Sequence, residues 1–147
     1  MRKIWFDMDG TIADFYGVEN WLGMLMEEDT TPYREAKPLI ATELLVKVLV
    51  ELIEKGYSIN IVSWTSKNST RDFAERVERA KLAWLEKYFS SVVFDNIDII
   101  PYGTPKGEGR KGILFDDEKN NRKEWARHEN NLAFDVDNII KILENLI

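Results

Sequence analysis

Residues 3–11, KIWFDMDGT, decide the fold. An apolar run stops at Asp7, and a second aspartate, Asp9, follows two residues later, just ahead of Gly10. A short, continuous apolar run is typical of a central strand that is covered on both faces. Glycine lets the backbone turn sharply where such a strand ends. We therefore expect a buried strand that delivers two carboxylates into one small volume.

Two carboxylates at this spacing repel each other unless a cation lies between them or one of them carries a proton. A bound cation or a protonated carboxyl group at this position would indicate a functional site. The alternative is a strand followed by a plain turn, since aspartate and glycine both favour turns. An isolated Asp-x-Asp-Gly fits both interpretations, so the rest of the chain has to decide between them.

The composition fits one compact domain over residues 1–147, with enough apolar side chains (44%) for a real core. The chain has no cysteine, which excludes disulfides, cysteine zinc sites and thiol catalysis. It has a single histidine, His128, which excludes a histidine-rich metal site. A bound metal would need mainly oxygen ligands, and these favour a hard ion such as Mg²⁺.

The net charge of −6 argues against a protein that coats nucleic acid, although a local cation can still attract a small phosphorylated substrate. No apolar stretch approaches the roughly 20 residues of a membrane helix, and the N-terminus does not resemble a signal peptide. We therefore expect a cytoplasmic protein with no membrane partner. A homo-oligomer stays open.

Strand-like and helical segments alternate along the chain. The segments with strand character after residue 11 are residues 57–62, 97–100, 111–115 and 132–134, with residues 92–94 a weaker candidate; those with helical spacing are residues 39–55, 69–88 (as one helix or two) and 137–146. Such alternation implies right-handed crossovers and a mostly parallel sheet. We expect a three-layer, Rossmann-like α/β fold.

Polar residues follow several of these strands directly. They are Asp7, Asp9, Ser63, Asp116 and Asp117, and Lys106 lies on a Gly/Pro-rich loop that we expect to join them. In parallel sheets, ligands bind beyond the carboxyl ends of the strands. The convergence of acids, a hydroxyl and a lysine at one sheet edge predicts a functional site there.

This set of residues suits phosphoryl transfer. An aspartate can attack phosphorus and form an acyl phosphate, provided that Mg²⁺ and a lysine offset the repulsion between the two anions. A second aspartate can give a proton to a leaving alcohol and later take one from water. An alkoxide needs that proton more than a phosphate leaving group does, so Asp9 favours phosphoester hydrolysis over ATP-driven transport.

At these residues the sequence resembles a known family. The strand with DMDGT is similar to the first motif of the haloacid dehalogenase (HAD) superfamily, and Ser63, Lys106 and Asp116-Asp117 match its second, third and fourth motifs in order. The stretches AKLAWLEK (80–87), PYGTPK (101–106) and ILFDDE (113–118) resemble its 5′(3′)-deoxyribonucleotidase branch. The resemblance implies a HAD-like fold and a Mg²⁺-dependent phosphomonoester hydrolase.

The resemblance also implies roles for the acids. Asp7 would be the nucleophile and a Mg²⁺ ligand. Asp9 would be the general acid and base, and would bind Mg²⁺ through its backbone carbonyl. Asp117 would be the direct metal ligand, with Asp116 acting through water or orienting the site.

For the phosphate, the resemblance implies Ser63, with Trp64 or Thr65 close by, and Lys106 as the neutralising cation. Lys81 is the second choice for that cation. Taken alone, Lys81 has the character of a solvated helix lysine, but a lysine in the same Lys-x-Ala-Trp setting can lie near the phosphate in the resembling branch.

Residues 13–38 depart from the family pattern. Deoxyribonucleotidases carry a sizeable cap domain after the first motif, whereas here we expect only a small helical cap insert at about 13–38. The aromatic residues Phe15, Trp21 and Tyr33 could stack on a base or could pack the cap onto the core. A short cap leaves the substrate open between a deoxynucleoside monophosphate and another small phosphorylated molecule, the latter implying a general small-molecule phosphatase.

Three other classes of function compete with hydrolysis. A phospho-accepting signalling module uses similar residues, but its accepting aspartate lies on a middle strand, where this chain has Ser63. A phosphotransferase or mutase needs water excluded by a good lid, which a short insert does not favour. A catalytically inactive binding protein would gain nothing from clustered carboxylates.

Overall fold

The computed structural model describes residues 2–147, and their strands form one parallel sheet. The sheet order is β3-β2-β1-β4-β5, and all four strand pairings are parallel. The strands are β1 (Lys3–Phe6), β2 (Ser58–Trp64), β3 (Asn96–Ile100), β4 (Ile113–Phe115) and β5 (Leu132–Phe134). The central place of β1 confirms the predicted α/β fold, with the DMDGT stretch at the middle of the sheet edge.

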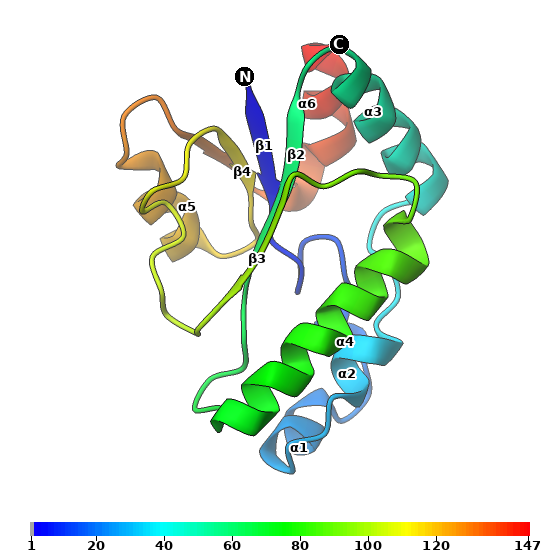
Figure 1. Ribbon diagram of the computed structural model, residues 1–147, viewed down its shortest axis with the longest axis vertical. Helices are drawn as coiled ribbons and strands as arrows, with labels where there is room; N and C mark the ends of the chain where they lie inside the picture. The colour runs from blue at the N-terminus through cyan, green and yellow to red at the C-terminus, as the bar shows by residue number, and fades with distance from the viewer. Residues whose placement is uncertain (1) are drawn as a thin grey trace.

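Helices cover both faces of this sheet (Figure 1). The longer helices are α3 (Thr42–Glu54), α4 (Arg71–Phe89), α5 (Lys119–Ala126) and α6 (Ile139–Leu146); the shorter ones are η1 (Phe15–Gly17), α1 (Trp21–Met26), α2 (Thr31–Glu35) and η2 (Val136–Asn138). Within residues 2–147, no helix is both long and apolar enough to cross a membrane.

The alternation of side chains along β1 explains the three layers. Successive residues of a strand point to opposite faces. Ile4 and Phe6 belong to the large core cluster with residues of α3, α4 and α6. Trp5 packs on the other face against Trp125 of α5, with ring centroids 6.1 Å apart. Trp125 is fully buried.

Several element boundaries differ from the predicted ones. β2 continues two residues further than expected, because Ser63 and Trp64 still pair with β3. α3 begins three residues later than predicted. The backbone of Pro38 forms a β-bridge with Ala13, and the Leu39 amide donates to the Ile12 carbonyl at 2.9 Å, so this segment is tied to the loop after β1.

The other differences concern the second half of the chain. α4 is a single helix, and the Thr70 side chain caps it by accepting from the Phe73 amide. Residues 92–94, the weaker of the two strand candidates in this region, do not form a strand. The expected strand at 97–100 is present as β3, which begins one residue earlier, at Asn96. α5 was not predicted: of its eight residues only Asn121 and Trp125 are buried, so its sequence carries almost no apolar periodicity.

Residues 13–38 contain η1, α1 and α2, which lie beside the N-terminal half of α4 in Figure 1. Phe15 and Tyr33 form a separate buried cluster with Phe73, Val77 and Ala80 of α4. The aromatic residues of this insert therefore pack on α4.

Candidate active site

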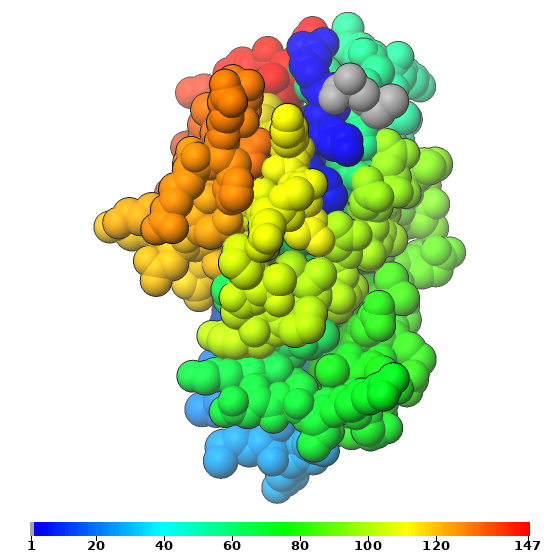
Figure 2. Space-filling view, turned by 60° about the vertical axis from the view of Figure 1, so that its left-hand side comes forward, coloured from blue at the N-terminus to red at the C-terminus, as the bar shows by residue number. Residues whose placement is uncertain are grey.

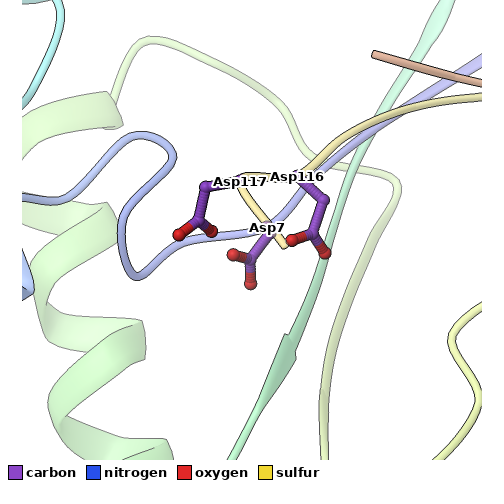
Figure 3. Close-up of side chains that lie close together, drawn as sticks. All are labelled: Asp7, Asp116 and Asp117. Atoms are coloured by element: carbon purple, nitrogen blue, oxygen red, sulfur yellow. The ribbon is translucent and has the colours of Figure 1, made fainter. Parts of the chain in front are cut away.

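Three aspartates gather at the carboxyl ends of β1 and β4. Asp7 and Asp116 are each the first residue after a strand, and both are held by backbone bonds to the neighbouring strand: the Asp7 amide donates to the Phe115 carbonyl at 3.0 Å and the Asp116 amide to the Phe134 carbonyl at 3.2 Å. Figure 3 shows the carboxylates of Asp7, Asp116 and Asp117 lying close together. One oxygen of each lies within 4.8 Å of the others.

Neighbouring residues fix the orientation of this trio. The Thr11 hydroxyl lies 3.2 Å from Asp7 Oδ2 and 3.2 Å from Asp117 Oδ1, and its oxygen accepts from the Asp117 amide. Gly10 has a φ of +80°, and a Cβ at this position would collide with the Asp117 carboxylate. Both residues belong to the DMDGT stretch, so the turn after β1 also determines how the three carboxylates are arranged.

Lys106 provides the positive charge inside the cluster. Its side chain is 2% exposed, and Nζ donates to Asp7 Oδ1 at 2.9 Å and to Asp116 Oδ2 at 2.7 Å. Burial lowers the pKa of Lys106, but the charges of Asp7 and Asp116 outweigh burial and raise it, so the ammonium stays charged. The predicted position of Lys106 at the sheet edge agrees with this geometry.

One ammonium does not balance three carboxylates. Burial, followed by the charge of Asp7, raises the pKa of Asp116 to about 6. Burial and the charges of Asp7 and Asp116 raise the pKa of Asp117 to about 7. A divalent cation would remove this repulsion, and the donors available to it are carboxylate oxygens, which suit Mg²⁺. The residues therefore fit the metal that the sequence predicts.

The loop that carries Lys106 is fixed to β2 and to α5. Trp64 at the end of β2 donates from Nε1 to the Thr104 carbonyl at 2.8 Å, and the Gly107 amide donates to Oε1 of Glu124 on α5 at 2.8 Å. Figure 2 shows this yellow loop on the surface between the green segment after β2 and the orange region of α5. Sequence analysis did not identify Glu124, because α5 itself was not predicted.

Asp9 lies apart from the trio and pairs with Lys81 of α4. Lys81 Nζ donates to Asp9 Oδ2 at 2.9 Å, to Ser63 Oγ at 2.7 Å and to the Trp64 carbonyl at 2.7 Å. Burial raises the pKa of Asp9, the Lys81 charge lowers it and the Asp7 charge raises it, with a net increase.

The solvated-helix interpretation of Lys81 is wrong, because its side chain is only 1% exposed. A signal for this was present in the sequence. Lys81 follows Val77 by four residues and precedes Leu85 by four, so all three lie on one face of the helix, and that face is the buried one.

A cavity of about 810 Å³ opens in front of these groups. It joins the acid site to the insert, and it is lined by Asp7, Asp9, Ser63, Trp64, Lys106 and Asp117 on one side and by Phe15, Tyr16, Trp21 and Tyr33 on the other. Neither Lys81 nor Asp116 lines it; both lie behind its wall.

The aromatic residues of the insert contribute unequally to this cavity. Phe15 and Tyr33 are 3% and 6% exposed, and their rings pack against each other with centroids 4.7 Å apart. Tyr16, which sequence analysis did not single out, is 49% exposed and contacts Trp21 edge-on at 5.0 Å. Tyr16 and Trp21 therefore offer the freer aromatic surface on this side.

Two solved structures resemble the chain over nearly its whole length. The crystal structure of D,D-heptose 1,7-bisphosphate phosphatase from Burkholderia thailandensis aligns with 99% of this chain and 98% of its own, with a TM-score of 0.60 and 11% sequence identity. The chain therefore shares the α/β fold of this phosphatase. The same enzyme from B. bronchiseptica, complexed with magnesium and phosphate, gives a TM-score of 0.54 at the same coverages and identity. No protein-family model and no curated protein sequence matches the chain.

Proposed function

We propose that this protein is a Mg²⁺-dependent phosphomonoester hydrolase that works through a phosphoryl group on Asp7. The observation that carries the proposal is the position of Asp7: its carboxylate lies on the cavity wall, 2.9 Å from the buried Lys106 ammonium and beside two further carboxylates. The likeness of the fold to phosphatases, one of them bound to magnesium and phosphate, supports the same reaction class.

Asp7 is the nucleophile in this proposal. One of its oxygens is held by Lys106 and the other by Thr11, which fixes the carboxylate in place before substrate arrives. Mg²⁺, held by Asp7, Asp117 and the Asp9 carbonyl, with Asp116 acting indirectly, would supply the positive charge that lets an anion approach a phosphate dianion. Lys106 adds a second positive charge at the same place.

The phosphate oxygens are bound by the end of β2. Ser63, Trp64 and Thr65 all line the cavity, next to Lys106. A hydroxyl and backbone amides in this position can hold the oxygens that the metal leaves free. Asp9, on the same wall, is the acid that protonates the leaving oxygen and the base that activates water.

The substrate that we propose is a deoxynucleoside monophosphate. The cavity extends well beyond the acid site and has room for a sugar and a base. Four aromatic side chains line this cavity and can stack on a base. They are Tyr16 and Trp21 of the insert, and Trp64 and Tyr102, whose ring centroids lie 4.9 Å apart. Phe15 and Tyr33, which are buried, instead pack the insert, acting as a small cap, against α4.

Phosphate release from a panel of substrates tests the proposal. The panel holds deoxy- and ribonucleoside monophosphates, sugar phosphates and p-nitrophenyl phosphate, each with Mg²⁺ and with EDTA, and the Asp7→Asn variant runs beside the wild type. We expect Mg²⁺-dependent release, fastest from deoxynucleotides, and none from the variant. Release from p-nitrophenyl phosphate and sugar phosphates only would leave a general phosphatase, and full activity of Asp7→Asn would contradict the mechanism.

A further inference from the structure

The site contains two buried ammonium groups with different surroundings. Lys106 contacts two carboxylates, those of Asp7 and Asp116. Lys81 contacts one carboxylate, that of Asp9, and two neutral oxygens, those of Ser63 Oγ and the Trp64 carbonyl. Lys106 already provides positive charge beside Asp7, so the contacts of Lys81 need a separate explanation.

Lys81 is poorly placed to bind phosphate itself. An ammonium group has three N–H donors, and here each has an acceptor at 2.7–2.9 Å. The side chain is 1% exposed and does not line the cavity, whereas Asp9 and Ser63 both do. Seen from the cavity, Lys81 lies behind these two residues and connects them.

We propose that Lys81 is a positioning residue for proton transfer by Asp9, an inference that rests on the proposed hydrolase function. Lys81 holds Asp9 Oδ2, and no described residue donates to Oδ1, so Oδ1 is free for the substrate. The same ammonium donates to Ser63 Oγ and to the Trp64 carbonyl, each at 2.7 Å, so its second and third donors are used within the protein and not by the phosphate. The side chain of Asp9 is 20% exposed, which lets it reach the leaving group.

The step can be written in full. An Asp7 oxygen forms a bond to phosphorus as the ester P–O bond breaks, and the electron pair of that bond goes to the leaving oxygen. The leaving oxygen takes the proton of the Asp9 carboxyl group and departs as a neutral alcohol. Asp9 becomes a carboxylate paired with the Lys81 ammonium. In the second half of the reaction, the oxygen of a water molecule bonds to phosphorus while that water gives a proton to Asp9. The P–O bond to Asp7 breaks, and its electron pair returns to the Asp7 carboxylate.

Lys81 acts on this step by fixing the position of Asp9. Its place on α4 and its hydrogen bond to Oδ2 at 2.9 Å hold the carboxyl group in one orientation. General acid catalysis commonly contributes a factor of roughly 10²–10⁴, and it matters only where the leaving oxygen needs a proton. Loss of Lys81 should therefore slow the hydrolysis of esters whose leaving group is an alcohol. It should have little effect on esters whose leaving group departs readily as an anion.

The experiment compares Lys81→Met with wild type on two substrates, the best alkyl phosphomonoester of the panel and 2,4-dinitrophenyl phosphate. The quantity measured is kcat/KM, because it reports formation of the acyl phosphate and not its hydrolysis. We expect a fall of about 100-fold on the alkyl ester, a fall of less than about fivefold on the aryl ester, and an unchanged inhibition constant for inorganic phosphate. Asp9→Asn should show the same selective loss, and the double variant should lose no more than the larger single loss.

Lys87→Met is the matched control, since Lys87 is an exposed lysine on the same helix. This substitution should leave kcat/KM unchanged for both esters. Ser63→Ala is the control for phosphate binding and should weaken inhibition by phosphate. Melting temperatures separate a folding defect from a catalytic one, and Lys81→Gln provides a second variant of similar length should Lys81→Met fail to fold.

Equal losses on both esters, with or without a lowered melting temperature, would overturn the inference, because a merely structural role acts on every substrate alike. Weaker inhibition by phosphate in Lys81→Met would overturn it in favour of phosphate binding. Absence of turnover by the wild type would overturn the proposed function instead, and the inference with it.

Discussion

Replacing Asp117 with asparagine should stabilise the metal-free protein while it removes activity. Asp117 has a pKa of about 7 against an ordinary value of 3.8, so the folded state resists its ionisation. At pH 8 this difference corresponds to roughly 4 kcal/mol of unfolding free energy. Because Asp117 is partly exposed, we expect a gain of only about 1–2 kcal/mol from Asp117→Asn.

The sign of the pH dependence follows from the same pKa. An acid whose pKa is raised on folding binds more protons in the folded state, so its contribution to stability falls as the pH rises from about 4 to about 7. The gain from Asp117→Asn should therefore be largest near pH 8 and smaller at pH 5. With Mg²⁺ the wild type should become the more stable of the two proteins. The ion stabilises the folded wild type by binding to its carboxylates, whereas the variant has lost one of these ligands.

The assay is urea unfolding in EDTA at pH 8 and pH 5, and then with Mg²⁺ at pH 8. Asp137→Asn is the control, since Asp137 is exposed and far from the cluster along the chain, and it should change the unfolding free energy by less than about 0.5 kcal/mol. An Asp117→Asn protein that is less stable than wild type in EDTA at pH 8, or that gains as much from Mg²⁺, would refute the reasoning.

Three further substitutions test other parts of the site. Lys106→Met leaves two buried carboxylates without their ammonium, and it should lower the unfolding free energy in EDTA by about 3–5 kcal/mol in urea titrations; a loss below about 1 kcal/mol would mean that the ion pairs are not formed. Gly10→Ala places a methyl group against the Asp117 carboxylate at a φ of +80°, and isothermal calorimetry should show weaker Mg²⁺ binding, whereas unchanged affinity would contradict the crowding. Tyr16→Ala removes an exposed ring from the cavity, and it should raise KM for deoxynucleotides by up to about tenfold with kcat unchanged, while KM for p-nitrophenyl phosphate stays constant; equal changes for both would argue against contact with the base.

The sheet edge of the site was predictable because parallel strands repeat one geometry. Once residues 4–6 and 113–115 are identified as neighbouring parallel strands, Asp7 and Asp116 must follow them at the same edge. The backbone bonds of both residues continue the sheet by one step, which is why their side chains are buried and aligned. Apolar runs that end in acids carried all of this information.

The contribution of the helices to the site was harder to predict. The helical period places Lys81 on the buried face of α4, but its contacts with Asp9, Ser63 and the Trp64 carbonyl depend on how α4 packs against the sheet edge, which the sequence does not give. α5 was missed because two buried residues, Asn121 and Trp125, give too little periodicity. Glu124 and its bond to the Lys106 loop could not be found without that helix.

The aromatic residues of the insert illustrate a different limit. The sequence marked Phe15, Trp21 and Tyr33 as a group, but exposure depends on which ring packs against Phe73 of α4. Tyr16, next to a buried Phe15, is the ring left half exposed. Residue type predicted an aromatic wall, whereas only tertiary packing decides which of its members face the cavity.

Trapping the covalent intermediate tests the central claim most directly. The protein is mixed with substrate and Mg²⁺, quenched in borohydride, digested and analysed by mass spectrometry, since borohydride reduces an aspartyl phosphate to homoserine. The account predicts homoserine at position 7 in the presence of Mg²⁺ and its absence in EDTA. Rapid phosphate release with unmodified Asp7, or homoserine at position 116 or 117 instead, would contradict it.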